Sequence, residues 1–317
     1  MKTVLVTGGA GFIGSHLVDA LVQRGQRVRV LDNFSTGDPA NLDEVAGQID
    51  LIEGDLTDMD AVQQAMKGVE VVFHQAALAS VPRSVANPLA THRACVDGTL
   101  NVLLAARDAG VRRVVYAASS SAYGNSARLP KTETDPTAPL SPYAVAKLAG
   151  EQYCAAFSEV YGLETVRLRY FNVYGPRQTP DSPYAAVIPL FIQALRDGRP
   201  PRVHGDGQQS RDFTYVADVV QANLKAAEVA GVSGRVYNIA GGKRVSLLHL
   251  LHLLGDLMQV EVHPEFVAAR PGDVKHSQAD ISRAMNDLGY RPTTDIRTGL
   301  QACIEWADQR VRLAMTR

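Results

Sequence analysis

The stretch Thr3-Val-Leu-Val-Thr-Gly-Gly-Ala-Gly-Phe-Ile-Gly14 decides the fold. Its first five residues form an apolar run that is typical of a buried parallel strand. The glycines follow at once, and a helical pattern covers residues 15–24. Glycines at G-x-G-x-x-G spacing permit a tight turn, close approach to a pyrophosphate, and packing of the helix on the strand. The stretch therefore predicts a dinucleotide site, and the alternative is a glycine turn without a ligand.

Asp32 follows the next predicted strand, which covers residues 27–31. A carboxylate at this point can accept hydrogen bonds from an adenosine ribose, and its charge repels a 2′-phosphate. The neighbouring residue is Asn33 rather than an arginine. The sequence therefore favours NAD over NADP, and the alternative is that Asp32 is an ordinary turn residue.

Strands and helices alternate through the first half of the chain. Further strands are expected at residues 49–53, 69–73, 113–117 and 165–169, with helices at 58–67 and 88–109. This alternation predicts an α/β fold with a Rossmann-type doubly wound parallel sheet. Ligands of such sheets bind beyond the carboxyl ends of the strands. The residues expected at those ends are Asp55, Ala76, Ala77 and Ser119 to Ser121.

The alternation weakens after Gly175, where proline and arginine become more frequent. We expect an NAD-binding Rossmann domain over residues 1–170 and a smaller C-terminal substrate-binding domain over 171–317. A strand expected near 236–240 returns to the sheet, so the two domains interleave. The alternative for the second half is an irregular structural lobe.

The composition excludes several classes of protein. The chain has 317 residues, is 46% hydrophobic and carries a formal net charge of -1, without a long basic run. Neither a nucleic acid nor an anionic membrane is therefore an expected partner. Three scattered cysteines without metal-binding spacing indicate reduced thiols in a cytoplasmic protein and no metal site. No apolar run is long enough to span a bilayer.

A tyrosine and a lysine lie one helical turn apart in Ser141-Pro-Tyr-Ala-Val-Ala-Lys147. Ser141 suits a helix cap and Pro142 suits the first turn. Tyr143 and Lys147 then share one face of the helix, with the ammonium within reach of the phenol. A nearby positive charge lowers the pKa of a tyrosine from about 10 toward the range of a useful base. The alternative is a chance pair on a surface helix.

Ser119-Ser-Ser-Ala-Tyr-Gly124 follows the predicted strand at 113–117. Hydroxyls at a strand end could form an ordinary polar turn. Beside a Tyr/Lys pair and a nicotinamide site, they are better interpreted as hydrogen-bonding groups for a substrate hydroxyl.

Together these motifs resemble the extended short-chain dehydrogenase/reductase family, and most of all its NAD-dependent UDP-sugar 4-epimerases. The resemblance covers nearly the whole chain. It rests on Thr7–Gly14, Asp32-Asn33, Gly54-Asp55, the serine run, Tyr143-x-x-x-Lys147, Leu168–Gly175, Gly205-Asp-Gly and Arg211-Asp-Phe.

The resemblance implies roles for particular residues. The catalytic residues would be Tyr143, Lys147 and a serine of the run, with Ser119 and Ser120 preferred and Ser121 as a substrate contact. The cofactor NAD, bound tightly, would contact Gly8, Gly11, Phe12, Ile13, Gly14, Asp32, Asn33, Asp55, Leu56, Ala76, Ala77, Tyr143 and Lys147. The UDP-sugar would contact Ser80, Arg83, Ser121, Asn172, Ala186, Val187, Arg211, Arg270, Asp273 and Ser277.

Within that set, Arg211 and Arg270 would bind the diphosphate, because a charged fork with several donors suits it. Asp273 would bind the nucleoside ribose, and residues 184–188 would line the uracil pocket. Arg211 is placed between a turn and a strand expected at 213–216. Each arginine alone could instead be a solvated surface residue.

Two features bear on the reaction and the sugar. Related dehydratases and decarboxylases carry an acidic residue after the active-site hydroxyl, whereas this chain has serine and alanine there, which disfavours elimination. A tyrosine at the position of Ser277 would restrict the site to glucose and galactose, whereas a small residue admits an N-acetyl group. The branch that it resembles often has glycine where this chain has Ala79, which leaves the sugar open.

The resemblance therefore implies C4 epimerisation of UDP-N-acetylglucosamine and UDP-N-acetylgalactosamine, with UDP-glucose as a further substrate. The alternatives are a UDP-glucose 4-epimerase, an enzyme acting on UDP-glucuronate, a sugar-nucleotide reductase or a dehydrogenase that releases NADH, and a non-catalytic NAD sensor. Helices at 88–109 and 142–160 carry apolar residues beyond one core-facing stripe. Related enzymes pair such helices, so a homodimer is expected, and the alternative is that both helices are simply buried.

Overall fold

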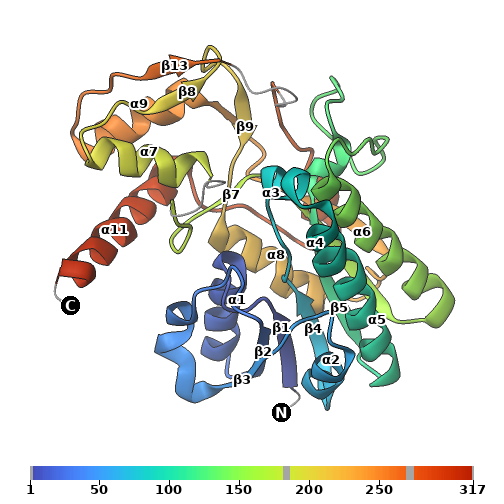
Figure 1. The fold of residues 1–317 in the computed structure, drawn as a ribbon. Coiled ribbons are helices and arrows are strands. Elements are labelled where there is room, and N and C mark those ends of the chain that lie inside the picture. Colours follow the sequence, from blue (N-terminus) through green and yellow to red (C-terminus); the bar gives the residue numbers. More distant parts are fainter. Residues whose placement is uncertain (1–2, 181–185, 269–274, 316–317) are drawn as a thin grey trace.

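The computed structural model describes residues 3–180, 186–268 and 275–315. Its centre is a sheet of seven parallel strands in the order β11-β6-β5-β4-β1-β2-β3 (Figure 1). The strands are β1 (Thr3–Thr7), β2 (Arg27–Asp32), β3 (Ile49–Glu53), β4 (Val69–His74), β5 (Arg113–Ser119), β6 (Glu164–Tyr170) and β11 (Arg235–Ile239). The chain starts in the middle of the sheet and moves outward in both directions, which confirms the predicted doubly wound fold.

Helices cover both faces of this sheet, so its strands are apolar on both sides. Val4 and Val6 of β1 belong to one core, and Leu5 between them belongs to the other. The first face is covered by α1 (Phe12–Gln23) and α8 (Val216–Glu228). The second face is covered by α2 (Met59–Met66), α5 (Gly98–Asp108) and α6 (Pro142–Tyr161) (Figure 1).

The predicted helix at 88–109 consists of three successive segments. A π-helical turn, η2 (Arg93–Asp97), separates α4 (Pro88–His92) from α5. A π turn inserts an extra residue into the helix, and such turns are frequent at functional sites. Here the turn buries Cys95 in an apolar cluster that includes Ala146 and Ala149 of α6.

The second half builds a separate apolar core (Figure 1, upper left). Three helices enclose it: α7 (Val187–Arg196), α9 (Leu247–Met258) and α11 (Ile296–Met315). Its short strands pair as β7 (Val173–Tyr174) with β10 (Thr214–Tyr215), β8 (Arg202–His204) with β13 (Glu265–Val267), and β9 (Ser210–Asp212) with β12 (Arg244–Ser246). The remaining elements are η1 (Pro39–Gln48), α3 (Val81–Ala86), η3 (Ser120–Tyr123) and α10 (Ser282–Asp287).

The strand expected at 213–216 is shorter than predicted, because Val216 already begins α8. Arg211 lies inside β9 rather than between a turn and a strand. Sequence reasoning missed this strand because it is only three residues long and pairs with a distant segment. The start of α6 was predicted correctly, since the Ser141 hydroxyl accepts a hydrogen bond from the Ala144 N–H at 3.2 Å.

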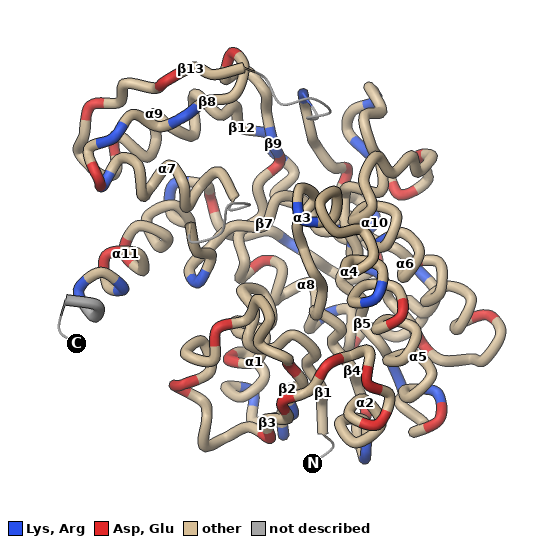
Figure 2. Tube along the Cα trace, viewed as in Figure 1, with Lys and Arg blue, Asp and Glu red and all other residues tan. Residues whose placement is uncertain are grey.

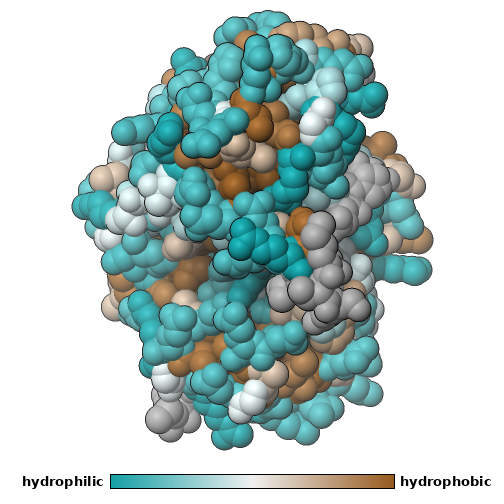
Figure 3. Space-filling view, turned by 90° about the vertical axis from the view of Figure 1, so that its left-hand side faces the viewer, coloured by the Kyte–Doolittle hydropathy of each residue, from teal (hydrophilic) through white to brown (hydrophobic). Residues whose placement is uncertain are grey.

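In the part of the chain that the structure describes, charges of both signs are distributed over both halves, without an extended basic stripe (Figure 2). On the face drawn in Figure 3, hydrophilic residues surround several separate hydrophobic areas. Among the described residues, no helix is both long and apolar enough to cross a membrane.

Candidate active site

A cleft of about 1410 Å³ lies at the carboxyl edge of the sheet and is lined by both halves of the chain. Pockets for one small molecule usually have volumes of about 300–1,000 Å³, so this cleft has room for two ligands. The predicted residues that line it are Gly8, Gly11, Phe12, Ile13, Gly14, Asp32, Asn33, Asp55, Leu56, Ala76, Ala77, Ser80, Arg83, Ser119, Ser120, Ser121, Tyr143, Asn172, Ala186, Val187, Arg211 and Ser277. Lys147 lies buried behind this lining, and Arg270 and Asp273 lie outside the described residues.

The glycine turn between β1 and α1 requires residues without side chains. Gly8 has a φ of +69°, and a Cβ there would lie 2.6 Å from the Ala76 Cα. A Cβ at Gly14 would lie 2.0 Å from the Gly8 carbonyl oxygen. No side chain of the described residues caps α1, so the N–H groups of its first turn face the cleft without such a partner. The turn therefore fits a pyrophosphate held by a helix N-terminus.

Asp32 closes the end of β2 beside this turn. Its carboxylate accepts hydrogen bonds from the Ala10 N–H and the Phe34 N–H, both at 2.9 Å. Nearby, the Asn33 amide donates to Asp55. Burial alone would raise the pKa of Asp55, but hydrogen bonds from Thr57 and Asn33 outweigh it and lower the pKa. Among the described residues, neither carboxylate pairs with an arginine, which suits a ribose diol better than a ribose phosphate.

Tyr143 and Lys147 lie one turn apart on α6, as predicted, but the Lys147 ammonium does not lower the pKa of Tyr143. The Lys147 ammonium donates to the Ala117 carbonyl at 2.8 Å and lies 5.0 Å from the centroid of the Tyr116 ring. Burial lowers the pKa of Lys147, and the Cys95 and Cys154 thiols oppose this shift. The lysine is thus fixed to β5 at the edge where the strand approaches the cleft.

Burial raises the pKa of the Tyr143 phenol well above its usual value, Cys95 raises it further, and a hydrogen bond with Ser119 lowers it. The predicted lowering of this pKa by Lys147 is therefore not found in the structure. The physical reason is that loss of water around a buried phenolate outweighs the other effects. The ammonium is meanwhile engaged by a backbone carbonyl.

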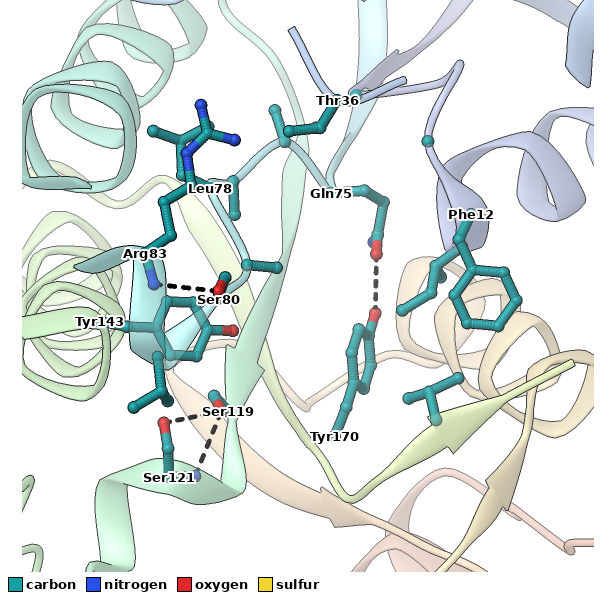
Figure 4. Close-up of a pocket in the computed structure, with 18 of the residues that line it drawn as sticks. Phe12, Thr36, Gln75, Leu78, Ser80, Arg83, Ser119, Ser121, Tyr143 and Tyr170 are labelled. Carbon is teal, nitrogen blue, oxygen red and sulfur yellow. Dashed lines mark hydrogen bonds between the residues drawn. The ribbon is translucent and has the colours of Figure 1, made fainter. Parts of the chain in front are cut away.

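The serine run forms the turn η3, and its hydroxyls have different surroundings. Ser119 Oγ accepts hydrogen bonds from the Ser121 N–H at 3.2 Å and the Ser121 hydroxyl at 2.8 Å. Ser119 and Tyr143 project into the same space from β5 and α6 (Figure 4). Ser120 also lines the cleft, while Ser121 is directed at Ser119. The geometry thus singles out Ser119 as the hydroxyl next to the phenol.

His74, at the end of β4, is completely enclosed behind this site. Burial lowers its pKa to about 3, with a further contribution from the charge of Lys147. Its two ring nitrogens lie 2.7 Å from the Thr7 hydroxyl and 2.9 Å from the Thr99 hydroxyl. The imidazole is therefore neutral and links three elements instead of titrating near neutral pH.

The expected substrate residues that the structure describes line the cleft from both halves of the chain. Ser80 caps α3, since its hydroxyl accepts a hydrogen bond from the Arg83 N–H at 3.2 Å (Figure 4). The Asn172 amide donates to the Asp212 carbonyl at 2.9 Å. Arg211 donates to the carbonyls of Ser210 and Lys275 at 3.1 and 3.3 Å, and its side chain still lines the cleft.

Ser277 is half-buried in the cleft wall, and its N–H donates to the Ser210 carbonyl at 3.0 Å. Ala186 and Val187 also line the cleft at the start of α7, while Tyr184 lies outside the described residues. The Ser277 side chain is small and takes up little of the cleft at this point.

Sequence reasoning missed two polar residues of the cleft wall. The Tyr170 hydroxyl donates to the Gln75 side-chain oxygen at 3.2 Å (Figure 4). Asn223 of α8 also bonds both residues. Their positions at the ends of β4 and β6 were an available signal, because polar residues at carboxyl ends of parallel strands meet at one edge.

Comparisons with known proteins place the chain in a family. The model of the NAD dependent epimerase/dehydratase family matches residues 4–240. A putative UDP-glucose 4-epimerase of Methanocaldococcus jannaschii is 38% identical over 305 residues, which are 96% of this chain and 97% of the relative. The protein therefore belongs to the NAD dependent epimerase/dehydratase family, and NAD is its cofactor.

Solved structures agree with this assignment. A UDP-N-acetylglucosamine 4-epimerase from Methanobrevibacter ruminantium, in complex with UDP-N-acetylmuramic acid, has a TM-score of 0.94 and 41% identity, covering 98% of this chain and 99% of the other. A UDP-glucuronic acid 4-epimerase from Bacillus cereus, with UDP-glucuronic acid and NAD, has a TM-score of 0.91 and 32% identity, covering 97% and 99%.

We expect Gly14→Ala to weaken NAD binding by at least about tenfold, which corresponds to ~1.4 kcal/mol. The added methyl group would collide with the Gly8 carbonyl and open the turn that faces the pyrophosphate. Isothermal titration of the cofactor-stripped protein with NAD measures the effect. Gly47→Ala is the matched control, because nothing lies within 4 Å of a Cβ there. Equal NAD affinity in the Gly14 variant and the control would contradict the assigned role of the turn.

Proposed function

We propose that the protein is a UDP-sugar 4-epimerase that interconverts UDP-N-acetylglucosamine and UDP-N-acetylgalactosamine, with UDP-glucose and UDP-galactose as further substrates. The observation that carries the proposal is the pairing of Tyr143 with Ser119 in a cleft that also contains the glycine turn and Arg211. Relatives that act on UDP-glucose, UDP-N-acetylglucosamine and UDP-glucuronate support a UDP-sugar substrate.

In the proposed reaction, the Tyr143 phenolate takes the proton of the sugar 4-hydroxyl, and Ser119 orients that oxygen. Lys147 is assigned a positioning role, because its bond to the Ala117 carbonyl of β5 fixes α6 and thereby the place of Tyr143. NAD supplies a reversible hydride acceptor and a positive charge at this site when it is bound. The sugar becomes a 4-ketone, turns about its diphosphate link, and is reduced on its other face while Tyr143 returns the proton.

The diphosphate has to stay bound while the sugar turns. We assign this role to Arg211, with Asn172 beside it and with Arg270 from outside the described residues. Asp273 is assigned to the nucleoside ribose. Since the cofactor ends the cycle unchanged, we also propose that NAD remains tightly bound between turnovers.

The residues after Ser119 argue against neighbouring reactions. Elimination of water or loss of a carboxylate by related enzymes needs an acidic group beside the active-site hydroxyl, whereas Ser120, Ser121 and Ala122 follow Ser119 in this chain. Glu133 is the nearest acid along the chain with a buried side chain, but its carboxylate accepts a hydrogen bond from the Asn238 N–H at 2.8 Å. Inversion of configuration at C4 is therefore favoured over elimination and decarboxylation.

We expect the protein to convert UDP-N-acetylglucosamine and, more slowly, UDP-glucose, and not UDP-glucuronate. Ser277→Tyr should abolish the first activity and retain the second, because the larger side chain fills the space for the acetamide. Incubation with each UDP-sugar, followed by chromatography of the products, measures both. Turnover of UDP-glucose alone by the unaltered protein would contradict the small-residue argument. Net NADH release would instead indicate a dehydrogenase, and no conversion of any UDP-sugar would favour an NAD sensor.

Tyr143→Phe should remove nearly all epimerisation, by about 10²- to 10⁴-fold, because it deletes the proposed general base. NAD content, read from absorbance after denaturation, should remain as in the unaltered protein. Because burial raises the pKa of Tyr143, turnover of the unaltered protein should also rise with pH as the phenolate fraction grows. A Phe variant with substantial activity would exclude Tyr143 as the base.

We also propose a homodimer formed through the face of α3, α4 and α6. These helices pack side by side and expose Val85 (66%), Leu89 (56%) and Val145 (53%). Clustered apolar side chains of this size on a surface are typical of an interface. In a symmetric dimer, these apolar side chains would be buried against the same face of the second copy.

Sedimentation at micromolar concentration should therefore give a dimer, and Leu89→Glu should shift it toward the monomer because a charge would be buried. Leu51→Glu is the matched control, since Leu51 is an exposed leucine (46%) on the edge strand β3. A monomeric unaltered protein would refute the proposed interface.

A further inference from the structure

Arg169 touches both of the elements that carry the proposed proton-transfer residues. It lies in β6, directly opposite Ala118 of β5, and therefore next to the strand end that carries Ser119. Only 3% of the residue is exposed. A guanidinium in such a place needs partners, because an isolated buried charge is very costly.

Its first partner is Glu151 of α6. Arg169 Nε donates to Glu151 Oε2 at 2.8 Å, and Nη2 donates to Oε1 at 2.6 Å. The two side chains are 4% and 2% exposed. Glu151 lies on α6 two helical turns beyond Tyr143, and Lys147 between them bonds the Ala117 carbonyl. Charged hydrogen bonds therefore fix α6 to β5 and to β6 in a buried layer.

Its second partner is Tyr123, the last residue of the serine turn η3. The Arg169 guanidinium carbon lies 4.7 Å from the centroid of the Tyr123 ring. The Tyr123 hydroxyl donates to Asn238 Oδ1 of β11 at 2.6 Å. The turn that begins at Ser119 is thus held at its far end by β6 and β11.

We propose that Arg169, oriented by Glu151, is a positioning residue that sets the serine turn against α6 and thereby maintains the contact between Ser119 and Tyr143. The inference rests on the proposed function, because it assigns the network to the alignment of that pair. Neither Arg169 nor Glu151 lines the cleft, so neither is a catalytic residue.

Physical chemistry favours a geometric role over a stabilising one. The desolvation cost of a buried ion pair offsets most of its attraction, and an apolar pair of similar volume often folds as well. A guanidinium, in contrast, is a planar fork that fixes one orientation against a carboxylate and stacks on an aromatic face. A rigid link of this kind matters most where small displacements between reacting groups reduce the rate.

The first test is Tyr123→Leu in the NAD-loaded protein, which removes the ring and leaves the ion pair intact. We expect kcat for UDP-N-acetylglucosamine to fall by about 10- to 100-fold, because the serine turn shifts, with KM changed by less than about twofold. Tyr161→Leu is the matched control, since Arg107 lies 5.0 Å from the centroid of the Tyr161 ring at the far end of α6. The control should leave kcat unchanged.

The second readout does not need a substrate. The ionisation of Tyr143 is isolated as the difference in ultraviolet absorbance between each protein and the same protein with Tyr143→Phe. Loss of the hydrogen bond from Ser119 should raise the ionisation midpoint by about half a pH unit or more in Tyr123→Leu. The titratable groups that face Tyr143 and Lys147 are unaltered in this variant: Cys95 of η2, Tyr116 of β5, His74 of β4, and Cys154 and Glu151 of α6.

The third test replaces both charges at once, in the double variant Glu151→Leu/Arg169→Met, which leaves no unpaired charge. We expect a folded protein with its NAD content retained, a low kcat and the same rise in the Tyr143 midpoint. An unchanged kcat and midpoint in both variants would overturn the proposal, as would a fall in kcat that only parallels loss of NAD and of melting temperature. If the unaltered protein converts no UDP-sugar, the proposed function fails, while the titration still decides the positioning role.

Discussion

The parallel direction of all the strands in the central sheet is the constraint on which the rest of the structure depends. Parallel strands place all their carboxyl ends at one edge, so the loops that leave β1, β2, β4, β5 and β6 meet there. The glycine turn, the carboxylates, the serine turn and Tyr170 come together for this reason, although they are far apart in the sequence. Helix α6 adds Tyr143 to this edge because Lys147 and Glu151 attach it to the two neighbouring strands.

Local signals in the sequence predicted most of the sheet and much of the cleft. The strand before the glycines, the Ser141 cap and the strand ends depend on a few neighbouring residues, so periodicity and capping rules reach them. The contacts that decide the chemistry are different. The partners of Lys147 and Arg169 come from other elements, and their choice depends on burial, which local patterns do not encode. The short strand β9 escaped prediction for the same reason, because it forms only by pairing with β12.

The pKa shifts in the site are caused more by burial than by pairs of charged groups. Burial raises the pKa of Tyr143 and lowers the pKa values of Lys147 and His74, so each group moves toward its neutral form. Asp212 of β9 shows the same effect in the second half of the chain, since burial raises its pKa to about 7 despite hydrogen bonds from neighbouring N–H groups. A positive charge that enters such a site acts in a medium that screens it weakly, and it therefore has a large effect on a nearby phenol.

The size of the cleft has a consequence for selectivity. In the proposed reaction, the sugar ring presents first one face and then the other to Tyr143, so a close-fitting wall cannot enclose it. We therefore expect affinity to come from the nucleotide, and the proposed contact at Ser277 and a few other side chains at the margin of the cleft to select the sugar. When one set of residues binds the nucleotide and another selects the sugar, one or two substitutions can change the sugar preference while the reaction stays the same. Diversity of substrates among proteins with the same fold is the evolutionary outcome to be expected.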